Sequence, residues 1–178
     1  CSCIELPVNT LQWLAQSRSL TPTGLLNPAA PLQPLGPPGQ RFVFGMPLAS
    51  VAGYIGGLLA NPRLEPGRAY DLAMQDRVLR PLGMRSSTFD LQRALAGNHA
   101  EPHGLGPDGK PARADGVLGR AVVPYRPAAG LWTSARELIR YVALLRGLDR
   151  RVADNRAEEL LSALGLADDA ELLVCDYS

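Results

Sequence analysis

The chain has 178 residues, 46% of them hydrophobic, so it is long and apolar enough to bury a core, which excludes wholesale disorder. Its net charge of +1 provides no broad basic surface for nucleic acid or an anionic membrane, so neither is an expected partner. No run of 18 apolar residues occurs, and the sequence therefore predicts no transmembrane segment.

The beginning of the sequence and its cysteines leave the cellular compartment open. The first residues, CSCIELPVNT, contain neither an initiator Met nor the charged and apolar regions of a signal peptide. We interpret the chain as a fragment, and the alternative is a processed lipoprotein with a lipidated Cys1. The spacing of Cys1, Cys3 and Cys175 favours incidental thiols over a disulfide or a zinc site. The localisation is therefore unknown.

The first 40 residues are expected to be irregular apart from one short helix. Thr21 followed by Pro22 is typical of a helix start. The Pro-rich segment 28–38 then repeats proline every three residues, which is the spacing of a polyproline II helix. It is expected to be a stiff loop, and a ligand for a proline-binding domain is the alternative.

Two helices are expected in the next part of the chain. Residues 41–44 are typical of a short strand or an extended entry to a helix. Residues 47–60, PLASVAGYIGGLLA, predict a buried helix whose small residues let neighbouring elements approach closely. A second helix is expected at residues 69–79, because apolar residues recur there on one face, and Pro81 should end it.

Residues 97–119 are rich in Gly, Pro, Asn and Asp and are expected to form a loop. His99 and His103 are four residues apart, a spacing that places two imidazoles on one face of a helix. Because prolines and glycines make a helix improbable here, no metal site and no cofactor are predicted. The following RAVVPY, residues 120–125, is expected to supply a strand edge.

The clearest local signal is the segment TSARELIRYVALLRG, residues 133–147, which predicts a helix. Ser134 and Glu137 form the pattern of a capping box, and Gly147 fits the residue after the helix end. The same logic predicts another helix from Asn155 to Gly165. ELLVCDY, near the end of the sequence, is typical of a strand.

Three segments in this order carry a family resemblance. They are PPGQRFVFGMPLASVAGYIGGLLA, VLRPLGMRSSTFD and VVPYRPAAGLWTSARELIRYVALL, and together they span residues 37–147. They resemble the serine β-lactamase-related family, which includes class C β-lactamases, penicillin-binding D,D-peptidases and esterases. The resemblance implies acyl transfer to a serine and hydrolysis of a small-molecule ester, peptide or β-lactam.

The catalytic groups that this resemblance implies are not found in the sequence. The family uses a serine and a lysine three residues apart, S-x-x-K, because the amine must lie one helical turn from the hydroxyl that it deprotonates. The chain has a single lysine, Lys110, and Pro107 stands three residues before it. The family's Y-x-N positions are occupied by Phe44 and Met46, which have neither a phenolic proton nor an amide. Both residues also suit a plain hydrophobic core. The sequence contains no K-T-G or H-x-G box either.

These observations predict an α+β fold of which residues 1–178 form a single, partial domain. It should be the mostly helical central portion of a β-lactamase or D,D-peptidase-like fold, with few short strands and an incomplete sheet. We expect a fragment or degenerate member of the family, a pseudoenzyme without catalytic residues. The alternative is a non-catalytic binding protein that uses an apolar cleft or segment 28–38. An incomplete sheet should also leave apolar helix faces exposed.

Overall fold

The computed structural model describes residues 20–29, 36–37, 39–40, 45–101, 103–106, 108–113 and 120–175. The expected extended segment 41–44, including Phe44, and most of the Pro-rich segment 28–38 lie outside these residues. The chain divides into two compact units, and each unit combines two separate stretches of sequence. The first unit comprises residues 1–77 and 117–130, and the second comprises residues 78–116 and 131–178.

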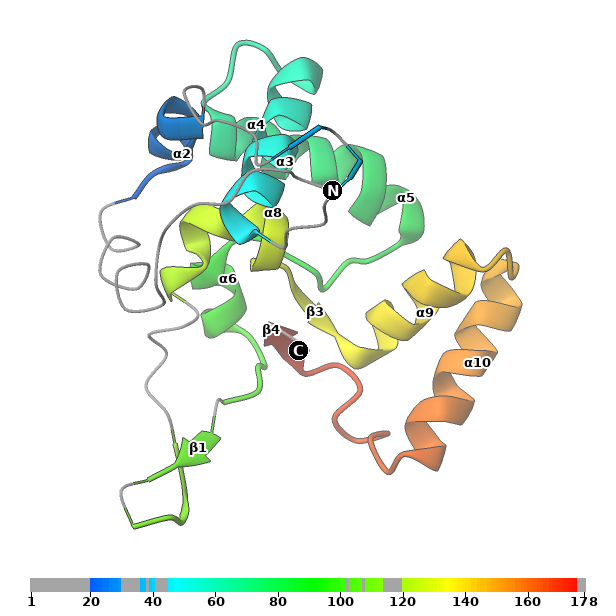
Figure 1. Ribbon diagram of the computed structural model, residues 1–178. Coiled ribbons are helices and arrows are strands. Elements are labelled where there is room, and N and C mark those ends of the chain that lie inside the picture. Colours follow the sequence, from blue (N-terminus) through cyan, green and yellow to red (C-terminus); the bar gives the residue numbers. More distant parts are fainter. Residues whose placement is uncertain are drawn as a thin grey trace. The chain divides into compact units, whose positions relative to one another are not determined.

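All the regular secondary structure described in the first unit is helical. Its elements are α2 (Pro22–Ala29), α3 (Met46–Ala60), α4 (Pro66–Met74), the 3-10 turn η2 (Val123–Tyr125) and α8 (Arg126–Ala129) (Figure 1). The expected cap of α2 is present, because the Thr21 hydroxyl accepts a hydrogen bond from the Gly24 amide at 3.0 Å. The helix nevertheless continues through Asn27 and Pro28, where the Pro-rich composition predicted its end.

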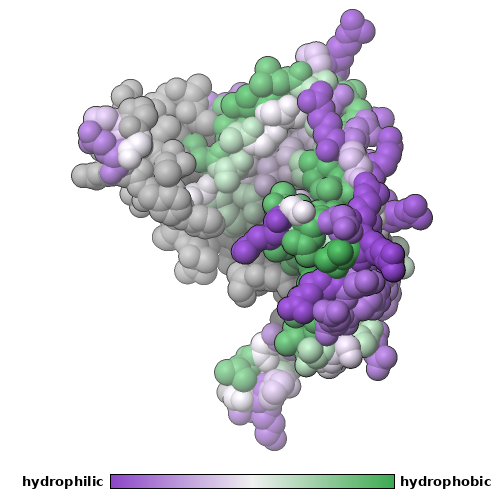
Figure 2. Space-filling view, turned by 90° about the vertical axis from the view of Figure 1, so that its right-hand side faces the viewer, coloured by the Kyte–Doolittle hydropathy of each residue, from purple (hydrophilic) through white to green (hydrophobic). Residues whose placement is uncertain are grey.

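Helix α3 matches the predicted helix 47–60, and its glycines explain how it packs. A Cβ on Gly57 would lie 2.6 Å from the backbone of Tyr70 in α4, and one on Gly53 would lie 2.4 Å from Pro127 in α8. Glycine is therefore required where α4 and α8 cross α3. The opposite face of the same helix is exposed: Ile55 is 48% and Leu59 81% accessible. Figure 2 shows hydrophobic residues at the surface of the molecule.

The predicted helix 69–79 is present but longer than expected. It begins with α4 at Pro66, passes through a π-helical turn, η1 (Gln75–Leu79), and continues into α5 (Arg80–Leu82). Pro81 does not end it, because the wider π turn immediately before it accommodates a residue without an amide proton. The helix ends instead at Gly83, which adopts a left-handed φ of 71°.

The second unit contains the two small sheets of the described chain. Its elements are α5, α6 (Leu91–Ala96), β1 (His103–Leu105), β2 (Pro111–Arg113), β3 (Trp132–Ser134), α9 (Ala135–Leu145), α10 (Arg150–Ala163) and β4 (Leu173–Cys175). Strands β3 and β4 pair antiparallel, with Thr133 opposite Val174. The predicted strand near the end of the sequence is thus confirmed as β4. Trp132 packs with Ala94 and Leu173 in the core.

Strands β1 and β2 form a hairpin within residues 97–119, where only a loop was expected. His103 pairs with Arg113, and every residue of both strands is exposed. Three-residue strands with no buried face leave no alternating pattern in the sequence, which explains why the prediction missed them. In the turn between the strands, Gly109 adopts a φ of 73°.

The prediction of a strand edge at residues 120–125 is wrong. Val123–Tyr125 form the 3-10 turn η2 instead. Pro124 lacks the amide proton that a strand ladder needs, and its carbonyl accepts a hydrogen bond from the Tyr54 hydroxyl at 2.6 Å. The apolar residues of this segment are buried by helix packing and not by a sheet.

Helices α9 and α10 were both expected, but the start of α10 was misplaced. Ser134 caps α9 by accepting a hydrogen bond from the Glu137 amide at 3.3 Å, and Gly147 follows its end with a φ of 84°. Helix α10 begins at Arg150 and not near Asn155, because the Asp149 side chain accepts a hydrogen bond from the Val152 amide at 2.9 Å. An aspartate is as good a cap as asparagine, and this one stands six residues earlier.

Candidate functional site

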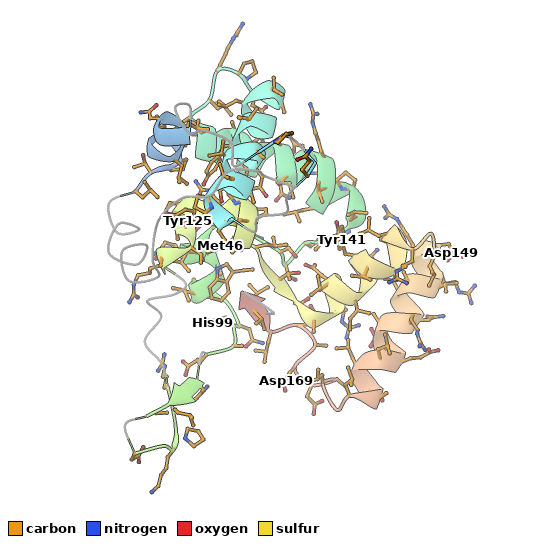
Figure 3. All side chains as sticks on the ribbon, viewed as in Figure 1. Met46, His99, Tyr125, Tyr141, Asp149 and Asp169 are labelled. Carbon is orange, nitrogen blue, oxygen red and sulfur yellow. The ribbon has the colours of Figure 1, made fainter. Side chains whose placement is uncertain are left out.

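The first turn of α3 contains Met46, one of the two residues that occupy the expected Y-x-N positions. Met46 is the first residue of the helix, and Gly45 before it is extended, with φ −155° and ψ 105°. Gly45 has no side chain to cap the helix, so the backbone conformation and the proline at position 47 define the start. Figure 3 shows Met46 at this end of α3.

Two buried hydroxyls further along α3 fix the helix against residues 124–125. The Ser50 hydroxyl donates a hydrogen bond to the Tyr125 carbonyl at 3.2 Å, and the Tyr54 hydroxyl donates to the Pro124 carbonyl at 2.6 Å. Both side chains are completely buried. These hydroxyls satisfy backbone carbonyls that would otherwise lie unpaired in the core, so their role is to hold the helix in place.

The first unit also contains an aromatic pair and an ion pair whose charges act on both phenols. The rings of Tyr54 and Tyr70 meet edge to face, with centroids 6.0 Å apart. The guanidinium of Arg126 lies 3.3 Å from the carboxylate of Asp71. Burial, with a contribution from the Asp71 carboxylate, raises the pKa of Tyr70 to about 12, although Arg126 opposes the shift. Burial likewise raises the pKa of Tyr54, so both phenols lose their protons less readily than an exposed tyrosine does.

The chemistry available at the start of α3 is therefore limited. Met46 is half-buried, and its thioether is at most a weak hydrogen-bond acceptor. Phe44, which occupies the other expected Y-x-N position, lies outside the described residues. Tyr54 and Tyr70 cannot replace a catalytic phenol, because the Tyr54 hydroxyl donates to a backbone carbonyl and both side chains are buried.

The second unit contains a polar cluster that the sequence analysis did not identify as a network. The buried carboxylate of Glu137 accepts hydrogen bonds from the amides of Ser86 and Ser87, both at 2.9 Å. It also accepts one from the Ser87 hydroxyl at 2.6 Å, and that hydroxyl lies 2.7 Å from the hydroxyl of Thr133.

This cluster corrects one sequence interpretation. The Ser134 half of the predicted capping box is present, but the Glu137 side chain turns to residues 86–87, about 50 positions away in the sequence. A weak signal was available: RSSTFD is rich in hydroxyl residues, and a carboxylate on the buried side of an amphipathic helix needs donors.

The single lysine and the two histidines lie in the second unit, within residues 99–110. Lys110 is exposed in the β1–β2 hairpin, and its amide donates to the Asp108 carboxylate at 3.1 Å. The Nδ1 atoms of His99 and His103 contact the carbonyls of Gly97 and Glu101 at 3.0 and 2.9 Å. Among the described residues, no group of three or more potential ligands is placed to hold a metal ion.

Comparison with protein families decides the assignment. The β-lactamase family matches the sequence over residues 9–171, which is most of the chain and includes parts of both units. The chain belongs to the β-lactamase family. No curated protein and no solved structure matches it significantly.

Membership of the β-lactamase family agrees with the predicted fold. The described residues form an α+β arrangement dominated by helices, with two separate two-stranded antiparallel sheets and no closed sheet, consistent with part of a β-lactamase-like fold. The family is related to serine hydrolases, and membership of the β-lactamase family implies small-molecule substrates. In the part of the chain that the structure describes, no helix is both long and apolar enough to cross a membrane.

Proposed function

We propose that this member of the β-lactamase family does not catalyse acyl transfer with these 178 residues. The proposal rests mainly on the position of Lys110, the only lysine, which lies exposed on the β1–β2 hairpin. A serine nucleophile needs a base within hydrogen-bond reach, and no serine stands three residues before this amine. The replacement of the family's asparagine by Met46 removes a second polar group.

The buried serines of the described chain are already used in other roles. Ser50 donates to a backbone carbonyl, and Ser134 caps α9. Ser87 is the one serine whose hydroxyl contacts a carboxylate among these residues, but it is only 2% exposed, so a substrate cannot reach it. Losing a positioned acid or base typically lowers a rate by about 10²–10⁴, and here both the base and the Y-x-N groups are missing.

A fluorophosphonate probe tests the proposal directly. The purified chain is incubated with the probe, and adducts are located by mass spectrometry of tryptic peptides, with an active serine esterase as positive control. We expect no serine to be labelled above the level seen in the heat-denatured chain. Stoichiometric labelling of a single serine, abolished by replacing that serine with alanine, would refute the proposal.

The proposal includes two cases that have different histories. The chain is either a piece of a longer hydrolase or a degenerate member whose catalytic groups have been replaced. Reading the encoding DNA upstream of Cys1 separates them: an in-frame S-x-x-K motif indicates the first case, and its absence across a complete reading frame indicates the second. We further propose that both units belong to one partial domain, which the continuous family match over residues 9–171 supports.

A non-catalytic interaction protein is a second candidate. The exposed Ile55 and Leu59 on the outer face of α3 favour it, because large apolar side chains in water are costly unless covered. A pull-down comparing the original chain with a P31A/P34A variant and an I55S/L59S variant would assign any binding to the Pro-rich segment or to α3. Unchanged binding in both variants would remove this candidate as stated.

A further inference from the structure

Helix α10 is buried along only one narrow stripe of its surface. Its buried residues are Ala153, Ala157 and Leu161, one per turn on a single stripe, and the rest of its surface is mostly exposed. Among the described elements it packs extensively only against α9, beside which it lies in Figure 1. Two of the three buried side chains are single methyl groups, so this contact removes little apolar surface from water.

Ion pairs supply much of the remaining contact between the two helices. Arg136 of α9 pairs with Glu158 of α10, and Arg140 pairs with Asp154 at 2.8 Å. The pairs follow the register of an antiparallel helical hairpin. Arg140 lies four residues after Arg136 on α9, and its partner Asp154 lies four residues before Glu158 on α10. Arg136 also pairs with Glu171, which follows α10, at 2.5 Å.

Both ends of α10 are bounded by glycines with left-handed backbone conformation. Gly147, before the helix, has φ 84°, and Gly165, after it, has φ 70°. A Cβ on either residue would meet nothing within 4 Å, so neither glycine is held by packing. The other attachment near the beginning of α10 is polar as well: Arg150 donates a hydrogen bond to the Pro81 carbonyl of α5.

We propose that α10 separates from α9 as a unit, between Gly147 and Gly165, in a local opening controlled by its ion pairs with Arg136 and Arg140. The remainder of the second unit stays folded during this opening, because β3, β4 and the Glu137 cluster have their own buried contacts. Regions with few buried apolar contacts open with a smaller free-energy cost than the core does. Opening releases both arginines of α9 from their partners on α10.

Hydrogen exchange of the full chain, followed by mass spectrometry, measures this opening. Helix α10 has 14 residues, and an isolated helix of this length is marginally stable in water, so its amides exchange once it leaves α9. We expect peptides from residues 152–163 to exchange faster in about 1 M NaCl than in about 10 mM NaCl, because added salt screens exposed charges. Peptides from β3 and α9 should not change.

A matched pair of variants separates ion pairs between the helices from charge in general. D154N/E158Q removes the two carboxylates that face α9, and we expect exchange in 152–163 to rise about 3- to 10-fold with loss of most of its salt dependence. E159Q is the control, because Glu159 pairs with Arg156 within α10 itself. We expect E159Q to change exchange by less than about 2-fold.

Two results would overturn the proposal. One is that peptides from residues 152–163 exchange at the same rate in D154N/E158Q as in the original chain. The other is an increase that appears equally in β3 and α9, because the unit then opens as a whole and α10 has no separate motion.

Discussion

Replacing Glu137 is the most informative test of how the second unit is held together. The Glu137 carboxylate is 6% exposed and accepts three hydrogen bonds, two from the Ser86 and Ser87 amides and one from the Ser87 hydroxyl. In E137A these donors lose their acceptor, although the Ser87 hydroxyl keeps Thr133 at 2.7 Å. Within the described part of the chain, the two amides have no such second partner.

The cost follows from the number of donors left without an acceptor. A buried donor without a partner costs about 1–3 kcal/mol, so two amides predict that E137A lowers the free energy of unfolding by about 2–6 kcal/mol. E137Q keeps one accepting oxygen but turns an amide group toward a donor, and we expect it to cost about 1–3 kcal/mol. The order of stability should therefore be original chain, E137Q, E137A.

Urea denaturation followed by circular dichroism and tryptophan fluorescence measures these differences. E101Q is the matched control, because Glu101 pairs with Arg113 at the surface, where its side chain is 42% exposed. An exposed ion pair contributes about 0–1 kcal/mol, so E101Q should leave the midpoint almost unchanged. If E137A proves no less stable than E101Q, the Glu137 cluster does not hold residues 86–87 to α9 and the reasoning fails.

Two further predictions concern the first unit. G57A should lower stability by about 1–3 kcal/mol in thermal melts, because its Cβ meets the Tyr70 backbone. G56A should raise it by about 0.5–1 kcal/mol, because that Cβ enters open space in a helix; equal effects of the two would contradict the packing described for α3. The pKa of Tyr70 is raised from 10.0 to about 12, so the unfolded chain loses this proton first as pH rises. The contribution of the protonated Tyr70 to the free energy of unfolding is complete below pH 10. As the pH rises toward 12, this contribution falls by up to about 2–3 kcal/mol. Y70F should flatten the fall of the urea midpoint between those pH values, and an equally steep fall would contradict the assignment to Tyr70.

The sequence predicted local features well where one helix carries its own signals. Ser134, Gly147 and the apolar residues between them define α9 without any distant partner, and the structure confirms that helix. Helix α3 was equally visible, because small residues among apolar ones indicate close packing even before the partner is known. In both cases the information lies within about four turns of one helix.

The errors occurred where the outcome depends on backbone geometry or on partners that the spacing of residues does not reveal. Pro81 was expected to end a helix that the preceding π turn allows to continue. Residues 120–125 looked like a strand because they are apolar, but the Tyr54 hydroxyl binds the Pro124 carbonyl in a helical turn. The partners of Glu137, about 50 residues away, could not be read from the spacing of a capping box.

For the candidate site, the sequence provided residue identities and the structure added their surroundings. Motif spacing alone predicted that Lys110 is not the partner of a serine, and the structure places it on an exposed hairpin. The sequence could not predict that Ser50 and Tyr54 are occupied by backbone carbonyls, since their partners come from residues 124–125.

The interleaved sequence order of the two units has a consequence for biosynthesis. Residues 117–130 complete the first unit, yet they leave the ribosome only after residues 78–116 of the other one. Helix α3 must therefore wait for Pro124 and Tyr125 before its two hydroxyls find their acceptors. Nascent chains stalled before residue 117 should consequently remain sensitive to protease around α3, and those extended well past residue 130 should gain resistance there.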